Sequence, residues 1–229
     1  RGKVMTEFAL LNFAGADGAP VPGIKAGDRV LPLAAAFEAA GQKPGFPIAS
    51  TKDVLGAWDK AEPALAALAE NAAGKKIAKP LASVRLLAPI LYPDVIFCAF
   101  ANYTDHMREM SGREPPDKTK VKQLFFFKHP RAVAGAEETE KLQAYSKQVD
   151  WDAELEVVIG TPGRNVPVEK AMDHVAGYTI MNDLSLRDCG TRTDWNVKHD
   201  FMSGKSFDTG APMGPWIVTR DALDPSNLD

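Results

Sequence analysis

The stretch that most constrains this chain is residues 149–160, with the sequence VDWDAELEVVIG. In a β-strand, successive side chains point to opposite faces, so Asp152, Glu154 and Glu156 share one face. The next three residues, 157–159, are apolar on both faces, which is typical of a strand that enters a protein interior. The stretch therefore predicts a strand that carries carboxylates to the edge of an apolar interior.

Carboxylates in such a position repel each other and resist the loss of water, so they need protons, cationic side chains or a metal ion. A site built only from oxygen ligands suits a hard divalent ion such as Mg²⁺, Mn²⁺ or Ca²⁺. The alternative is a half-exposed strand whose polar face carries Asp152, Glu154 and Glu156 in water. This segment alone is compatible with both.

A third carboxylate follows another predicted strand, residues 175–183, which ends in Asn182 and Asp183. Asp183 follows an apolar run, whereas Glu154 and Glu156 precede one. The three carboxylates would complete a set of oxygen ligands with room left for water and substrate. Alternatively, Asp183 begins a turn or caps the next helix.

His106 and Glu109 lie three residues apart in a segment that Asn102 or Thr104 could cap as a helix. That spacing puts both side chains on one helix face. Such a pair suits a catalytic dyad, in which Glu109 orients the imidazole and His106 handles a proton of water near neutral pH. A solvated surface helix would show the same spacing.

Two lysines have alternative interpretations. Lys128 ends the predicted buried strand 124–128, where it either points into a site or extends to water. Lys205, in the sequence GKSFDT, is either a surface lysine or a cation that faces an anionic substrate.

The length of 229 residues fits one large domain, or one domain with a small companion. Helical patterns over residues 33–40 and 50–74 alternate with strand-like runs, and residues 1–85 contain no cluster of acidic, His or Cys side chains that suggests chemistry. We therefore predict a small α+β N-terminal domain over residues 1–85, a short connector, and a mainly β catalytic domain over residues 90–229.

The net charge, the apolar runs and the number of cysteines argue against several classes of function. The net charge of −3, without any basic cluster, argues against a nucleic-acid partner. No apolar run approaches the roughly 20 residues that a membrane helix needs, and the start has no secretory pattern, so a cytoplasmic protein is expected. Two distant cysteines, Cys98 and Cys189, imply neither a disulfide framework nor a thiolate zinc site.

The motifs together resemble the fumarylacetoacetate hydrolase family, of the acylpyruvate hydrolase and 2-hydroxyhepta-2,4-diene-1,7-dioate isomerase type. The resemblance covers about residues 90–229. Its motifs are Asn102-Tyr103-x-x-His106-x-x-Glu109, Asp152-x-Glu154-x-Glu156-Val-Val-Ile-Gly160, Asn182-Asp183-x-Ser185-x-Arg187-Asp188, Gly204-Lys205-Ser206-Phe207-Asp208-Thr209 and Pro212-Met213-Gly214-Pro215-Trp216.

The resemblance implies a curled mixed β-sheet, of the β-roll or barrel kind. It implies Mg²⁺ or Mn²⁺, with Ca²⁺ as a further candidate, bound by Glu154, Glu156 and Asp183. It also implies a water-activating dyad of His106 and Glu109, and Lys205 as a contact to substrate or oxyanion. The substrate-binding residues are then expected to be Tyr103, Lys128, Arg187 and Thr209.

The activity implied is a metal-dependent hydrolase that cleaves a C–C bond in acylpyruvates such as fumarylpyruvate or fumarylacetoacetate, acting as a homodimer. The alternatives are a decarboxylase, isomerase or hydratase on related 2-oxo or 2-hydroxymuconate acids, and a non-catalytic, metal-stabilised interaction domain. Two departures from the family pattern matter. Cys189-Gly190 stands where the family usually has Gln, and the chain stops at Asp229, so a catalytic domain truncated at its C-terminal end is expected.

Overall fold

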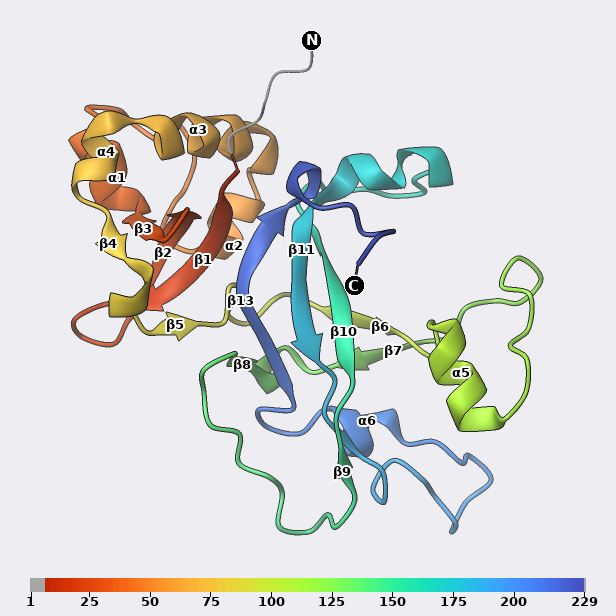
Figure 1. Ribbon diagram of the computed structural model, residues 1–229. Coiled ribbons are helices and arrows are strands. Elements are labelled where there is room, and N and C mark those ends of the chain that lie inside the picture. Colours follow the sequence, from red (N-terminus) through yellow and green to blue (C-terminus); the bar gives the residue numbers. More distant parts are fainter. Residues whose placement is uncertain (1–6, 229) are drawn as a thin grey trace.

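The computed structural model describes residues 7–228, and its centre is one open nine-stranded sheet (Figure 1). The strand order is β10-β11-β13-β1-β2-β3-β4, with β5 beside β1 and β8 beside β13. All neighbours are antiparallel except β13 and β8, which are parallel. The sheet is mixed and the fold mainly β, as predicted, but the strand order is linear and does not close.

The first part of the chain supplies one end of this sheet and a helical layer. Its strands are β1 (Ala9–Ala14), β2 (Pro20–Ala26), β3 (Arg29–Pro32), β4 (Lys79–Pro80) and β5 (Leu86–Leu87). Its helices are α1 (Leu33–Ala39), α2 (Thr51–Leu55), α3 (Trp58–Glu70) and α4 (Ala72–Lys76), followed by the 3₁₀ turn η1 (Leu81–Ser83). Figure 1 shows these helices gathered on one side of β1–β3.

The predicted helix over residues 50–74 is divided into three. Ser50 caps α2, because its side chain accepts a hydrogen bond from the backbone N–H of Asp53. The breaks fall between α2 and α3 and at Asn71, whereas Pro63 lies inside α3. Asn71 begins α4 by accepting hydrogen bonds from the N–H groups of Ala73 and Gly74.

The remaining elements surround the other end of the sheet. The strands are β6 (Ile96–Ala99), β7 (Phe125–Lys128), β8 (Val133–Gly135), β9 (Val149–Asp150), β10 (Ala153–Ile159), β11 (Val175–Asn182), β12 (Ser185–Leu186) and β13 (Ala211–Thr219). The helices are α5 (Thr104–Ser111) and α6 (Phe201–Lys205), with 3₁₀ turns η2 (Pro130–Ala132), η3 (Val168–His174) and η4 (Arg220–Ala222). The pairs β6–β7 and β9–β12 form two small separate sheets.

The sheet runs across the predicted boundary between residues 85 and 90. Strand β1 pairs with β13, so that Ala9 lies opposite Val218 and Leu10 opposite Ile217. One buried apolar cluster likewise extends from Phe8 to Ile217. The first 85 residues therefore share a sheet and a core with the last strand, and a division into two domains stays a prediction.

The apolar end of β10 differs from the prediction. Val158 is buried, but Val157 is 47% and Ile159 59% exposed. Val157 and Ile159 lie on the face of β10 opposite to Val158, and Ile180, on the same face of the neighbouring β11, is likewise 58% exposed, so this part of the face has no covering layer among residues 7–228. The run 157–159 is thus buried on one face, not on two.

Within residues 7–228, none of the helices combines the length and the apolar character that crossing a bilayer requires.

Candidate active site

Strand β10 and its neighbour β11 bring the predicted acidic residues to one face. Glu154 lies opposite Met181, and Glu156 lies opposite Thr179. Just before β10, the carbonyl of Asp152 accepts a 2.8 Å hydrogen bond from the N–H of Asp183. Asp152 and Asp183 are therefore neighbours where the two strands open, and Glu154 follows two residues further along the face of Asp152.

This face forms one wall of a cavity of about 720 Å³. The other walls come from the β6–β7 hairpin and from the start of α5. The charged and titratable residues that line the cavity include His106, Asp152, Glu154, Glu156, Asp183, Arg187 and Lys205. Seven side chains with acid–base or charge chemistry thus converge on one space from four separate segments of the chain.

Helix α5 brings His106 to the cavity. The hydroxyl of Tyr103, at the N-cap position of α5, accepts a 3.3 Å hydrogen bond from the N–H of Leu155, between the two glutamates of β10. His106 is half-buried and lines the cavity, whereas Glu109 is exposed and does not. No hydrogen bond joins these two described side chains, so the predicted dyad stays a prediction.

Each carboxylate oxygen of Asp183 forms an ion pair with a lysine. Its Oδ1 lies 2.6 Å from Lys128 Nζ, and its Oδ2 lies 2.5 Å from Lys205 Nζ. Lys128 also donates to the carbonyl of Leu184, at 3.0 Å, and its side chain is 0% exposed. Burial lowers the pKa of the Lys128 ammonium, and the Asp183 carboxylate opposes that effect.

Lys205 connects two carboxylates at the wall of the cavity. Its ammonium lies 4.0 Å from Asp152 Oδ2, in addition to the contact with Asp183, and 5.2 Å from the centre of the Phe126 ring. Arg187 contacts the same oxygen, Asp152 Oδ2, at 3.2 Å, and also bonds Asp150 at 2.9 Å. Two cations therefore fix the position of Asp152.

The two glutamates of β10 have different surroundings. Burial raises the pKa of Glu154, and the negative charges of Asp183 and Asp152 raise it further. The pKa of Glu156 rises to about 7 through burial alone, and its Oε2 is buried without a hydrogen-bond partner. Glu154 thus belongs to a group of interacting carboxylates with Asp152 and Asp183, whereas Glu156 stands apart from it.

The structure places several predicted residues differently from expectation. Lys128 neither reaches water nor lines the cavity, because its ammonium is enclosed by Asp183 and the Leu184 carbonyl. Thr209 also lies outside the cavity lining and has a backbone φ of 59°, an unusual value for a β-branched residue. Tyr103 and Arg187 do line the cavity. The Tyr103 hydroxyl accepts a hydrogen bond from Leu155, and Arg187 donates to Asp150 and Asp152.

Cys98 and Phe126, to which the sequence patterns assigned no role in the site, line the same cavity. Asp152, which the alternation predicts on the face of Glu154, lines it as well. Cys98 lies on β6, and its own sequence does not reveal that this strand lines the cavity. Burial and the charge of Asp183 raise the pKa of its thiol to about 12.

Within residues 7–228, no group of three or more His, Cys, Asp or Glu side chains is arranged closely enough to hold a metal ion. The chemistry of the donors nevertheless fits a hard divalent ion. Asp152, Glu154, Glu156 and Asp183 offer carboxylate oxygens on one cavity wall, and the buried Oε2 of Glu156 has no hydrogen-bond partner among the described residues. A bound cation would relieve the repulsion between these carboxylates and supply that missing partner.

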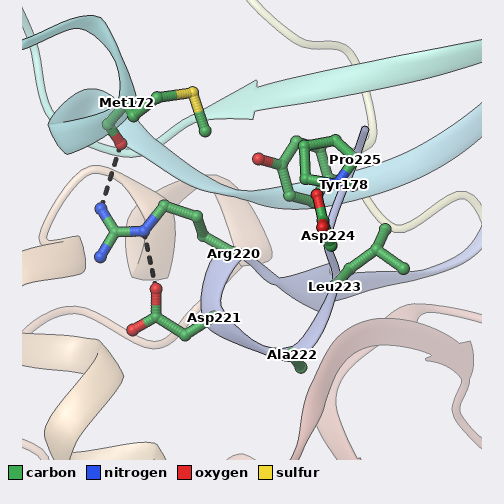
Figure 2. A pocket seen from close by; sticks show the side chains of 8 residues that line it. All are labelled: Met172, Tyr178, Arg220, Asp221, Ala222, Leu223, Asp224 and Pro225. Carbon is green, nitrogen blue, oxygen red and sulfur yellow. Dashed lines mark hydrogen bonds and ion pairs between the residues drawn. The ribbon is translucent and has the colours of Figure 1, made fainter. Parts of the chain in front are cut away.

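A second hollow, of about 510 Å³, lies near the last residues of the chain and is lined by Met172, Tyr178 and residues 220–225. Figure 2 shows that Arg220 is held by the Met172 carbonyl, at 3.0 Å, and by Asp221, at 2.9 Å. The buried Tyr178 hydroxyl has no hydrogen-bond partner among the described residues. None of the predicted site residues lines this hollow, so the larger cavity is the candidate active site.

Comparison with known proteins agrees with this location of the site. The family model described as "Fumarylacetoacetate (FAA) hydrolase C-terminal" matches residues 95–229, which are more than half of the chain and include most residues that line the cavity. The chain belongs to the fumarylacetoacetate hydrolase family. Members of the family are enzymes, among them hydrolases, isomerases and tautomerases.

Sequence relatives in the family include the mitochondrial oxaloacetate tautomerase fahd2 of Xenopus laevis, 39% identical over 150 residues, or 64% of this chain and 44% of the relative. Protein Rv2993c of Mycobacterium tuberculosis is 41% identical over 151 residues, or 66% of this chain and 53% of the relative. The chain therefore spans about half the length of these curated relatives.

Solved structures of the fumarylacetoacetate hydrolase family share the fold over nearly the whole chain. The fumarylacetoacetate hydrolase of Exiguobacterium antarcticum superposes with a TM-score of 0.69 at 29% identity, covering 96% of this chain and 69% of that one. The maleylpyruvate hydrolase of Sphingobium sp. SYK-6, in complex with manganese(II) and pyruvate, superposes with a TM-score of 0.67 at 26% identity, covering 95% and 69%.

Proposed function

We propose that this protein is a divalent-metal-dependent hydrolase that cleaves a C–C bond in acylpyruvate-type 1,3-diketo acids. The observation that carries the proposal is the meeting of Asp152, Glu154, Asp183, Lys205 and His106 at one cavity. That set combines oxygen donors for a cation, a positive charge for an anionic oxygen and an imidazole for proton transfer.

Glu154, Glu156 and Asp183 are the proposed ligands of Mg²⁺ or Mn²⁺, with Ca²⁺ as a further candidate. All three line the cavity, and the buried Oε2 of Glu156 has no hydrogen-bond partner among the described residues, whereas Asp152 already bonds Arg187 at 3.2 Å. When bound, a divalent ion supplies Lewis-acid stabilisation for the oxygens of a 2-oxo acid. Lys128 holds Asp183 in position from behind the cavity wall.

His106 is the proposed general base and acid. It takes a proton from water, the hydroxide adds to the distal carbonyl carbon, and the C–C bond to the pyruvyl methylene breaks. The electron pair of that bond passes to the pyruvate enolate, whose negative charge faces the Lys205 ammonium. His106 then returns the proton to the methylene carbon, which leaves pyruvate and a carboxylic acid. Glu109, with its carboxylate in solvent, remains a predicted partner of His106.

The manganese and pyruvate in the maleylpyruvate hydrolase structure support this chemistry, since pyruvate is the fragment that every acylpyruvate releases. A second candidate reaction is tautomerisation or isomerisation, which the names of the tautomerase relatives and of a structurally similar 5-carboxymethyl-2-hydroxymuconate delta-isomerase from Mycobacterium smegmatis support. The same cavity would stabilise the enolate in both reactions. Decarboxylation, hydration and a non-catalytic, metal-stabilised role are further candidates.

The test follows the ultraviolet absorbance of enolised acylpyruvates with Mg²⁺, with Mn²⁺ and with a chelator. We expect Glu154→Ala to lose metal binding and turnover, and His106→Ala to keep the metal while turnover stops. Glu156→Gln should weaken metal binding as well. Normal turnover in both the Glu154 and His106 variants would refute the assignment.

Product analysis separates the candidate reactions. Hydrolysis gives two carbon fragments, decarboxylation gives carbon dioxide, and isomerisation or tautomerisation gives neither. Metal binding without turnover of any of these acids would favour the non-catalytic role. We further propose a homodimer and a cytoplasmic location, which sedimentation of the purified protein and fractionation of the producing cell would test.

A further inference from the structure

Lys205 is held at the cavity wall by an aromatic ring as well as by carboxylates. Its ammonium lies 2.5 Å from Asp183 Oδ2, 4.0 Å from Asp152 Oδ2 and 5.2 Å from the centre of the Phe126 ring. A cation within about 6 Å of a ring centre is attracted by the negative charge of the ring face. Phe126 is 6% exposed and the Lys205 side chain 13%, so little water weakens this attraction.

Helix α6, which carries Lys205, also holds the Phe126 ring. Phe201 stacks on Phe126, with ring centres 4.9 Å apart and an angle of 11° between the ring planes. Phe201 and Lys205 are the first and last residues of α6, and side chains four residues apart lie on the same face of a helix. One face of α6 therefore contacts Phe126 through two residues, one aromatic and one charged.

Phe201 has further aromatic partners. His199 stacks on it at 5.7 Å and 14°, and Phe100 meets it edge-on at 5.6 Å and 65°. The contacts form a column that runs from the exposed His199, through Phe201 and Phe126, to the Lys205 ammonium at the cavity. Movement of the Phe126 ring would disturb the stacking along this column, so the ring is a rigid support for Lys205.

The backbone beside Lys205 is anchored to strand β7 independently of the rings. The Ser206 hydroxyl donates to the carbonyl of Phe127 and accepts from the N–H of His129, both at 3.1 Å. These bonds attach the end of α6 to β7 on either side of Lys128. With its backbone anchored, Lys205 keeps freedom only in its side chain, and that is the part that the ring contacts.

The ion pair with Asp183 does not by itself fix this side chain. Lysine carries a point charge on a flexible four-carbon stem, so its ammonium can follow a carboxylate oxygen in many conformations. Asp183 is also a proposed metal ligand, and a cation bound there would compete with Lys205 for Oδ2. The Phe126 ring attracts the ammonium whether or not Asp183 binds a cation.

We propose that Phe126 is a positioning residue, whose ring, held by Phe201, keeps the Lys205 ammonium at the cavity wall where the enolate charge develops. The inference rests on the proposed function for the part that Lys205 plays in turnover. The contact between the ring and the ammonium does not depend on the reaction, so it can be measured separately.

A double-mutant cycle tests the contact without turnover. Phe126→Leu keeps an apolar side chain and removes the ring, and Lys205→Met keeps the stem and removes the charge. We expect Phe126→Leu to raise the equilibrium constant of unfolding, measured in urea, at least about threefold more in the wild-type background than in Lys205→Met. If Phe126 only fills space, the two effects are additive, and additivity overturns the inference.

Phe37 provides the matched control for this cycle. It is a buried ring on α1, 3% exposed, and lies outside the cavity lining. Phe37→Leu removes the same atoms as Phe126→Leu but has no contact with Lys205 to lose. Its effect on unfolding should therefore be the same in the wild-type and the Lys205→Met backgrounds.

A ring of nearly unchanged shape provides the second measurement, which also serves if Phe126→Leu does not fold. In 3,4,5-trifluorophenylalanine, fluorine withdraws negative charge from the ring face. Placed at position 126, this residue should lower kcat for acylpyruvate cleavage about three- to tenfold and leave KM within about twofold. The same residue at position 37 should change neither constant. An unchanged kcat in the protein altered at position 126 overturns the positioning role.

The two measurements distinguish this inference from the proposed function. Coupling between Phe126 and Lys205 in a protein that cleaves no acylpyruvate would support the contact, while the hydrolase assignment fails. Cleavage of acylpyruvates without coupling, and without an effect of the fluorinated ring, would leave the hydrolase assignment in place and overturn the role of Phe126.

Discussion

Lys205 bonds Asp183 at 2.5 Å and lies only 4.0 Å from Asp152, so one ammonium group spans the two strand ends at the wall of the cavity. A second ammonium, that of Lys128, holds the other oxygen of Asp183 from inside the core. The two lysines therefore share a carboxylate but face different environments: Lys205 is open to the cavity and Lys128 is enclosed. Their substitution should have different effects.

Replacement of Lys205 should reduce turnover more than stability. Lys205→Met removes the cation that faces the developing enolate, and loss of one such stabilising group costs about 10²- to 10³-fold in kcat. We expect a change of that size for acylpyruvate cleavage. Lys198→Met, on an exposed side chain, is the matched control and should retain full activity. A kcat within threefold of wild type in Lys205→Met would contradict a catalytic role.

Replacement of Lys128 should instead destabilise the fold. Lys128→Met leaves Asp183 with a buried charge that has lost one partner, which costs about 3 to 5 kcal/mol of unfolding free energy. Urea denaturation measures the loss, and the exposed Lys122→Met serves as the control. Adding Asp183→Asn should recover part of the stability, because the unpaired charge is then removed. A loss below 1 kcal/mol would show that water reaches Asp183.

Glu156 should make stability depend on pH. Burial raises its pKa from the ordinary 4.5 to about 7, so between these values the folded protein binds more protons than the unfolded chain. Stability therefore falls as pH rises from about 4.5 through 7, by about 3 kcal/mol for this group. We expect Glu156→Gln, in the presence of a chelator, to remove most of that slope, whereas the exposed Glu169→Gln should leave it unchanged. The same slope in wild type and Glu156→Gln would refute the assignment.

Gly177 should not tolerate a side chain. A Cβ atom there would lie 2.1 Å from the backbone oxygen of Val218 on the neighbouring strand β13. Since backbone on both strands would have to move, Gly177→Ala should cost about 3 kcal/mol or more, at the upper end of overpacking effects. Gly190→Ala is the control, because its nearest contact would be 3.5 Å away at an ordinary backbone angle. Thermal unfolding of both variants provides the comparison.

Local sequence patterns predicted the parts of the site that depend on one segment. The alternation over residues 152–156 predicted a shared acidic face, and the i,i+3 spacing predicted that His106 and Glu109 lie on one helix, α5. They did not predict which acidic residues interact, because that depends on where Asp183 lies beside Asp152 across the β10–β11 pair.

Features that depend on distant partners were predicted less well. Lys128 is buried because Asp183, 55 residues away, receives its ammonium, and no pattern near Lys128 reveals that partner. The exposure of Val157 and Ile159 depends in the same way on which face of the β10–β11 pair other elements cover, which the apolar sequence of the strand does not specify. Thr209, in the connection between α6 and β13, lies outside the cavity lining.

The pairing of β1 with β13 has a consequence for biosynthesis. Leu10 leaves the ribosome long before Ile217, its neighbour in the finished sheet, has been translated. At a synthesis rate of about 5–20 residues per second, the nascent β1 strand waits at least ten seconds or so with one edge unsatisfied. Exposed strand edges of this kind promote aggregation, so the yield of active protein should depend on chaperones that shield the growing chain.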